Sequence, residues 1–246
     1  MASRLQIGVS RLEFIEPKIR AVFLNKTWIH LGDTSETIKR YSGAFFVEIF
    51  KKYSIKYILF KIFNALRGNA RPRVSAEDAI AIYEQTNFQD FYFKKGESLE
   101  FDDDAFDFIY SEHFFEHLFF DEAVALFKEC HRILKPGGVI RTAVPDADLR
   151  TYIKPEAVGF PDIKEAFTTP LKHKTRWSVY MLTEALKFSG FDAIPLTYCN
   201  REGEYIKNDP NDLKARYEGH AEKELIFNSS YVIRPDSLIV DGFKHA

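Results

Sequence analysis

The chain has 246 residues, which is enough for one α/β domain with its own core and an insertion. Its formal net charge of −2 argues against a nucleic-acid partner, because phosphate recognition normally needs a clear excess of basic residues. The two cysteines are far apart and show no CxxC spacing, so neither a disulfide framework nor a thiolate zinc site is expected. These features favour a cytoplasmic protein.

The sequence shows no sign of membrane insertion. Its first residues, MASRLQIGVS, lack the apolar run of a signal peptide. No stretch reaches the roughly 18 uncharged residues that a membrane span requires. We therefore expect a soluble protein without a membrane span.

Short apolar runs alternate with amphipathic segments of helical length, which is the pattern of a parallel sheet with crossover helices. One helix is expected at 121–134, where apolar residues recur at helical spacing until Lys135-Pro136-Gly137-Gly138. We expect Lys135 to complement the carbonyls at the end of this helix. A second helix is expected at 177–189. Seven strands are expected, at 4–8, 27–31, 91–95, 106–111, 139–144, 191–198 and 237–242.

The segment 34–89 is longer than an ordinary crossover and should contain a helical insertion. Its centre, 44–66, is apolar on every side of a helical projection, with lysines scattered among Phe, Tyr and Ile. One or two helices packed on the domain are the first interpretation, since such helices are usually buried. A substrate lid, a homodimer surface and a membrane-interface segment are the alternatives.

The most specific motif runs from Phe106 to Asp146 and reads FDFIYSEHFFEHLFFDEAVALFKECHRILKPGGVIRTAVPD. It resembles the fourth strand, the following helix and the fifth strand of class I methyltransferases, in particular bacterial methyltransferase-like proteins with a YSEHxxEHL strand end. SLIVDGFK is similar to the final antiparallel strand of that family. The resemblance implies a Rossmann-like seven-stranded α/β sheet with helices on both faces, in one domain spanning 1–246, and S-adenosylmethionine as the cofactor.

The cofactor residues follow from this resemblance, because such a sheet binds ligands at the carboxyl ends of its strands. Gly8 would let the backbone approach the methionine and ribose parts. Asp33 would accept hydrogen bonds from the ribose hydroxyls, although a helix N-cap is an equal alternative. The full expected set is Gly8, Asp33, Gly96, Glu97 and Ser111.

Three residues depart from the family pattern. Ser10 and Arg11 stand where further small residues of the LxLGCG motif are expected, and Lys95 stands where an acid normally faces the adenine. Glu97 could substitute from two residues away. These departures motivate an alternative function, a non-catalytic methyltransferase-like binding or scaffold protein.

His113, Glu116 and His117 match the HxxEH pattern of inverted zinc peptidases. The pattern follows an apolar strand here, whereas a peptidase carries it inside a long helix. A zinc peptidase is therefore only a remote alternative.

The same cluster is similar to one in small-RNA 3′-end 2′-O-methyltransferases and in ubiquinone-pathway O-methyltransferases. This similarity implies a divalent ion held by His113, Glu116, His117 and the later His173. Such an ion would orient a substrate hydroxyl and lower its pKa. In the structural alternative, Glu116 and His117 brace the turn and His113 lines the pocket. Without a metal, His113 or His117 would be the general base.

The leading hypothesis is a cytoplasmic S-adenosylmethionine-dependent methyltransferase. Its acceptor would be a small molecule or a sugar-derived, glycan-type compound, methylated at oxygen or nitrogen. Most of the catalysis would come from positioning in a dry site, since the transfer is an in-line displacement at a sulfonium-bound methyl group.

Overall fold

The computed structural model describes residues 4–8, 28–32, 86–91, 93–149, 173–208, 210–227 and 237–245. The chain divides into two compact units. Unit 1 comprises Met1–Val9 and Phe93–Ala246, and unit 2 comprises Ser10–Tyr92.

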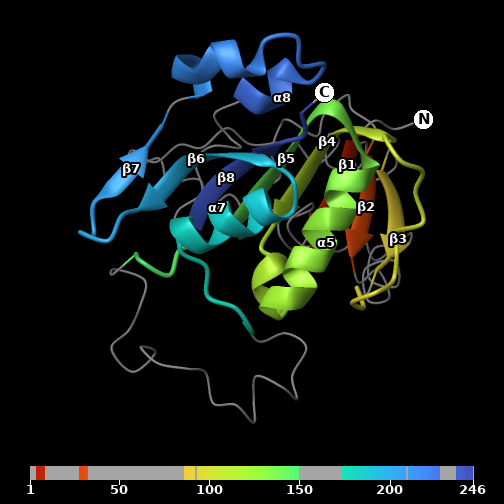
Figure 1. Ribbon diagram of the computed structural model, residues 1–246, viewed down its shortest axis with the longest axis horizontal. Coiled ribbons are helices and arrows are strands. Elements are labelled where there is room, and N and C mark those ends of the chain that lie inside the picture. Colours follow the sequence, from red (N-terminus) through yellow and green to blue (C-terminus); the bar gives the residue numbers. More distant parts are fainter. Residues whose placement is uncertain are drawn as a thin grey trace, which may run out of the picture. The chain divides into compact units, whose positions relative to one another are not determined.

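Unit 1 contains a mixed sheet (Figure 1). Its strands β1, β4 and β5 run parallel, while β8 pairs antiparallel with both β5 and β6, and β7 pairs antiparallel with β6. In sheet order the strands are β1 (Arg4–Gly8), β4 (Phe106–Glu112), β5 (Leu134–Pro145), β8 (Ser237–Phe243), β6 (Asp192–Cys199) and β7 (Tyr205–Lys207). The α/β class and the final antiparallel strand expected from SLIVDGFK are confirmed.

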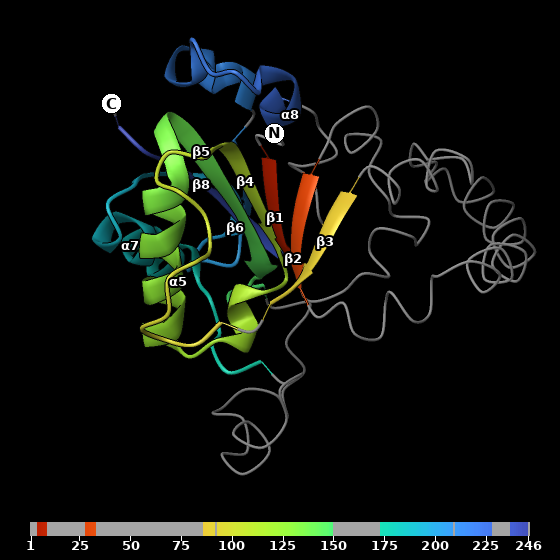
Figure 2. The ribbon, with the colours of Figure 1, turned by 90° about the vertical axis from the view of Figure 1, so that its right-hand side faces the viewer.

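Two helices, α5 (Phe120–Ile133) and α7 (Val179–Phe188), pack on the same face of this sheet, as Figures 1 and 2 show from two directions. The apolar residues of α5 point to the core because they recur at helical spacing. The helix begins with the Glu122 carboxylate accepting a hydrogen bond from the Phe119 N–H at 2.8 Å. Three shorter elements complete unit 1: η2 (Phe115–His117), η4 (Pro210–Tyr217) and α8 (Lys223–Phe227).

In unit 2 the described residues form a parallel pair, β2 (Trp28–Gly32) and β3 (Thr86–Asp90). The strand expected at 91–95 is therefore wrong by five positions. The apolar residues around Tyr92 favoured a strand later in the sequence. Instead, Lys94 to Glu97 form a turn in which the Glu97 N–H donates to the Lys94 carbonyl. Asp33, Ser10, Arg11 and the expected helices at 44–66 lie outside the described residues.

The described residues form eight strands, one more than expected. The addition is β7, a strand of three residues with exposed ends. No helix among the described residues is both long and apolar enough to cross a membrane.

The Lys135-Pro136-Gly137-Gly138 segment belongs to β5 and has the structural role expected of it. Gly137 has a φ of +79°, and a Cβ on Gly138 would lie 2.8 Å from the Lys135 carbonyl oxygen. The role expected for Lys135 is wrong, because its ammonium group binds the Asp107 carboxylate at 2.9 Å. Lys244 instead donates to the Leu134 carbonyl at 2.7 Å.

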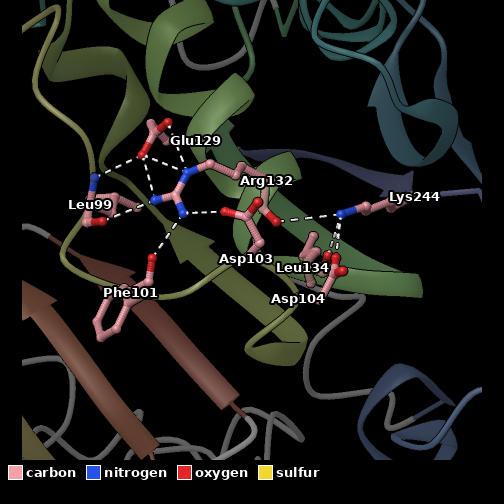
Figure 3. Close-up of polar contacts among 8 residues, drawn as sticks. All are labelled: Leu99, Phe101, Asp103, Asp104, Glu129, Arg132, Leu134 and Lys244. Atoms are coloured by element: carbon pink, nitrogen blue, oxygen red, sulfur yellow. Dashed lines mark hydrogen bonds and ion pairs between the residues drawn. The ribbon is translucent and has the colours of Figure 1, made fainter.

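A guanidinium group fastens the loop before β4 to helix α5 (Figure 3). Arg132 donates to the carbonyls of Leu99 and Phe101 at 2.9 and 2.8 Å, and to the carboxylates of Glu129 and Asp103 at 2.9 and 2.7 Å. The Leu99 N–H in turn donates to Glu129 at 2.8 Å. The planar fork of arginine suits this set of acceptors, which a lysine could not satisfy together.

A second guanidinium group is fully buried within the sheet. Arg141 on β5 forms a two-pronged ion pair with Asp241 on β8, with both N···O distances at 2.7 Å. Tyr217 donates to the same carboxylate at 2.7 Å, and Arg141 also donates to the Ile226 carbonyl at 3.0 Å. These bonds attach η4 and α8 to the sheet.

Candidate functional site

The carboxyl end of β4 leads into an unusual backbone conformation. His113 has a φ of +51°, a region that residues other than glycine rarely adopt. For such a residue the left-handed conformation costs about 1–2 kcal/mol. The bond from His113 N–H to the Ala143 carbonyl, 2.9 Å long, helps to hold it. The chain thereby turns out of the sheet and directly into η2, which carries Glu116 and His117.

Glu116 is the centre of the cluster and is only 1% exposed. The His113 Nδ1 atom lies 3.3 Å from Glu116 Oε1. The other ring nitrogen of His113, Nε2, lies 2.8 Å from the Ser237 hydroxyl at the start of β8. His113 therefore connects the end of β4, the buried carboxylate and a strand more than one hundred residues later.

His173 reaches the cluster because the residues after it bind to η2. The Lys174 and Thr175 N–H groups donate to the Glu116 carbonyl at 2.7 and 3.1 Å. The Thr175 hydroxyl donates to the Leu118 carbonyl at 2.6 Å. The rings of His117 and His173 meet edge to face with centroids 5.0 Å apart.

Three potential metal ligands thus come together. Donor atoms of Glu116, His117 and His173 all lie within 4.8 Å of one another. His113 contacts Glu116 but is not a member of this group. Although His173 is exposed, partial burial of its ring and the nearby Arg176 charge lower its pKa, which favours the neutral imidazole that a metal ligand requires.

A buried carboxylate braces the neighbouring strand ends. Asp146 accepts hydrogen bonds from the Cys199 and Asp148 N–H groups at 2.6 and 3.0 Å, and burial raises the pKa of its carboxyl group. Next to it, Ala147 N–H donates to the Trp177 carbonyl at 2.9 Å, which fixes the segment that carries His173. Sequence reasoning assigned no role to Asp146, Thr175 or Ser237.

Two expected cofactor residues lie at the same edge of the sheet. Gly8 pairs in register with Glu112, and Ser111 lies between Ile7 and Thr142. The backbones of Gly8 and Ser111 are therefore neighbours at the carboxyl ends of β1 and β4. The Ser111 side chain is fully buried.

Gly96 and Glu97 lie in an exposed turn. Lys95 binds Asp121, in the first turn of α5, at 2.7 Å, and this helix begins shortly after the carboxyl end of β4. The turn is thus attached to the same end of unit 1 as the cluster. Lys95, which stands where the family has an acid, is engaged in a salt bridge at the surface.

The HxxEH residues do not lie in a long helix. His113 precedes η2, and η2 contains only Phe115–His117. The two histidines are therefore not presented from consecutive turns of one α-helix, as a zinc peptidase of this type requires.

A cavity of about 570 Å³ lies at the opposite edge of the sheet, bounded by the starts of β5 and β6 and by the end of η4. The cations lining it are matched with anions, Lys135 with Asp107 at 2.9 Å and Arg216 with Asp192 at 3.5 Å. Its charges therefore hold the fold together, in contrast to the histidine cluster.

The family model described as "Methyltransferase domain" matches residues 42–142. A comparison with curated protein sequences gives no significant match.

Many solved structures match the backbone of this chain. A methyltransferase in complex with the Haloferax volcanii Trm112 methyltransferase activator is 14% identical, with coverage of 100% of this chain and 84% of that one and a TM-score of 0.49. A SAM-dependent methyltransferase from Archaeoglobus fulgidus is 16% identical, with coverage of 99% and 86% and a TM-score of 0.49. An S-adenosylmethionine-dependent methyltransferase from Mesorhizobium loti is 15% identical, with coverage of 98% and 90% and a TM-score of 0.47.

Similarities of this size say nothing about substrate. The family match includes the strand β4 and the short helix η2, which carry the YSEHxxEHL motif, and also the helix α5 that follows them. The family match covers 101 of the 246 residues, and over this part the chain is similar to methyltransferase domains.

Proposed function

We propose that this chain is an S-adenosylmethionine-dependent methyltransferase that acts in the cytoplasm on a small-molecule or sugar-derived acceptor, at oxygen or nitrogen. The observation that carries this proposal is the position of the histidine cluster. It follows β4 directly, beside the edge shared by Gly8 and Ser111. A ligand bound at this edge would have imidazole and carboxylate groups next to it.

Within this proposal, the cofactor binds at the carboxyl edge of the strands. The Gly8 backbone approaches its methionine and ribose parts, and Asp33 accepts hydrogen bonds from the ribose. Gly96, Glu97 and the Ser111 backbone complete the contacts. The exposed turn at Gly96 supports this assignment, because its attachment to Asp121 through Lys95 holds it at the same end of unit 1.

We further propose a divalent ion at the cluster of His113, Glu116, His117 and His173. Donor atoms around a first-row ion at 2.0–2.2 Å are about 3.4 Å from one another, so the separations of up to 4.8 Å among Glu116, His117 and His173 require side-chain rotations. Imidazole and carboxylate groups together suit zinc and similar ions better than calcium. When bound, the ion would polarise an acceptor hydroxyl.

The chain's own residues would perform the remaining steps. In the absence of an ion, His117 or His113 takes the acceptor proton, since histidine titrates near physiological pH. The buried Glu116 carboxylate would stabilise the imidazolium that forms. The rigid attachment of residues 174–175 to η2 would keep the groups in place.

Thermal melting with S-adenosylhomocysteine tests the cofactor part, because a ligand that binds only the folded state raises the Tm. Wild-type protein should be stabilised. Asp33→Ala should bind at least about tenfold more weakly in calorimetry, since a hydrogen bond to a charged group contributes about 1.5–3 kcal/mol. The matched control is Asp102→Ala, at an exposed aspartate. Equal affinity in both variants would exclude the ribose role of Asp33.

Measuring the zinc content of the purified protein tests whether an ion binds at the cluster. His173→Ala should lower bound zinc and methyl transfer together while leaving S-adenosylhomocysteine affinity nearly unchanged. His245→Ala, at an exposed histidine near the cavity of the opposite edge, is the control and should change neither. Full metal content in the His173 variant would contradict the proposed site. Cofactor binding without any methyl transfer would favour the non-catalytic alternative.

A further inference from the structure

The hydroxyl group of Ser237 reaches the histidine cluster from a strand that carries none of its members. Ser237 is the first residue of β8, and its Oγ atom lies 2.8 Å from Nε2 of His113. The other ring nitrogen, Nδ1, lies 3.3 Å from Oε1 of Glu116. The imidazole of His113 therefore has one nitrogen facing β8 and the other facing the cluster.

The distance between His113 and Glu116 already suits two ligands of one ion. Donor atoms at 2.0–2.2 Å from a first-row ion are about 3.4 Å apart, and the Nδ1 and Oε1 atoms are 3.3 Å apart. His117 and His173 would complete the proposed site by side-chain rotation, because their donor atoms lie only within 4.8 Å of each other and of Glu116. The contact to Ser237 therefore acts on a half of the site that has the spacing an ion requires.

We propose that Ser237 is a positioning residue, which holds His113 so that its Nδ1 atom serves as a ligand beside the Glu116 carboxylate. This inference rests on the metal site proposed above. An imidazole binds a metal through an unprotonated nitrogen, so the proton of a neutral His113 is then on Nε2. The Ser237 hydroxyl accepts the hydrogen bond from that N–H group. The serine thereby fixes both the tautomer and the orientation of the ring.

The backbones of Ser237 and His113 are both attached to the same strand, β5. Ser237 pairs with Pro145 in the ladder between β5 and β8, and it is fully buried. The His113 N–H donates to the carbonyl of Ala143, also on β5, at 2.9 Å. The sheet therefore sets the distance between the hydroxyl and the imidazole.

Cobalt(II) titration of the purified full chain tests this inference. The visible d–d bands of cobalt report on its ligands, and the titration gives its affinity. Ser237→Ala should bind cobalt about tenfold more weakly than wild type, because contacts that orient a ligand from outside the coordination sphere contribute about 10–100-fold. The matched control is Ser189→Ala, at a buried serine whose hydroxyl donates to the Ala185 carbonyl at 2.8 Å. It should leave the cobalt affinity unchanged.

A double variant shows whether the Ser237 hydroxyl acts through His113. His113→Ala removes a ligand, so it should lose more affinity than Ser237→Ala and should change the d–d bands. In that background Ser237 has no imidazole to hold. Adding Ser237→Ala should then lower the affinity by less than about twofold, whereas independent effects would multiply. The Tm of each variant, with its circular dichroism spectrum, shows that it is folded.

Three results would overturn the inference and leave the metal site standing. The first is equal cobalt affinity in Ser237→Ala and wild type. The second is the same loss from Ser237→Ala with and without His113, which would show that the hydroxyl does not act through the imidazole. The third is unchanged bands in His113→Ala, because His113 would then not be a ligand. If wild-type protein binds no cobalt while still binding S-adenosylhomocysteine, the proposed ion itself is excluded.

Discussion

The two edges of the unit 1 sheet use charged residues in opposite ways. At the edge formed by the amino ends of the parallel strands, and along α5, cations form ion pairs with anions at short distances. Examples are Arg132 with Asp103 and Lys244 with Asp104, both at 2.7 Å. At the carboxyl edge, polar side chains converge on one buried carboxylate, and the backbone is strained at His113. Paired charges stabilise a fold, whereas strain and converging polar groups are typical of functional sites.

The largest effect on stability should come from the buried ion pair. Arg141→Met leaves Asp241 as an uncompensated buried charge and should lower the free energy of unfolding by about 3–5 kcal/mol, measured by urea denaturation. Asp241→Asn in the same chain removes that charge and keeps an acceptor for Tyr217, so the double variant should recover much of the loss. A loss below about 1 kcal/mol in the single variant would show that this pair does not stabilise the fold.

A smaller effect is expected at Arg132, which is partly exposed. Arg132→Ala should lower the free energy of unfolding by about 2 kcal/mol, because the loop at 99–103 loses its attachment to α5. Arg132→Lys should recover only part of this, since an ammonium cannot bind the two carbonyls and two carboxylates together. Lys187→Ala, which breaks an exposed pair with Glu184, should cost about 0.3–0.5 kcal/mol. Equal losses at Arg132 and Lys187 would contradict this ranking.

Two histidines away from the cluster, the partly buried His131 and the buried His220, should make the fold sensitive to acid. Burial is the main cause that lowers the pKa of both His131 and His220. The unfolded chain therefore takes up protons that the folded chain does not, and the free energy of unfolding should fall as the pH falls below about 6.5. His131→Gln should make this fall shallower in urea titrations between pH 7 and 5, values chosen around the ordinary histidine pKa of about 6.5. An identical pH profile in the variant would refute the assignment.

At the functional edge, we expect two opposing effects on stability that largely cancel. His113→Asn loses the bond to Ser237 but relieves the backbone, and each effect amounts to about 1 kcal/mol. The free energy of unfolding should therefore stay within about 1 kcal/mol of wild type. A loss of more than about 3 kcal/mol would place His113 among the structural residues and remove the contrast between the two edges.

Local patterns in the sequence predicted much of unit 1. The helical spacing of apolar residues predicted α5, and the strand expected at 139–144 lies within β5, which begins earlier, at Leu134. Strand β7 was not predicted, because a strand of three partly exposed residues has no periodicity to detect. The position of β3 was missed because its sequence, TNFQD, is more polar than the residues that follow.

Without the family resemblance, the residues themselves predicted the candidate site only where neighbours in sequence are neighbours in space. The HxxEH spacing brought Glu116 and His117 together, and the family resemblance added His173. No sequence signal joins His113 to Ser237, because that contact depends on where β8 lies in the sheet. For the same reason the separation of His113 from the three potential ligands could not be predicted.

The most direct test of the account is anomalous diffraction from crystals grown with cobalt and S-adenosylhomocysteine. The account predicts one strong anomalous peak at about 2.0–2.2 Å from His113, Glu116, His117 and His173, with His113 still bonded to Ser237. It also predicts the nucleoside beside the Gly8 backbone at the same edge of the sheet. A peak among the paired charges of the opposite edge, or a nucleoside bound away from Gly8, would contradict it.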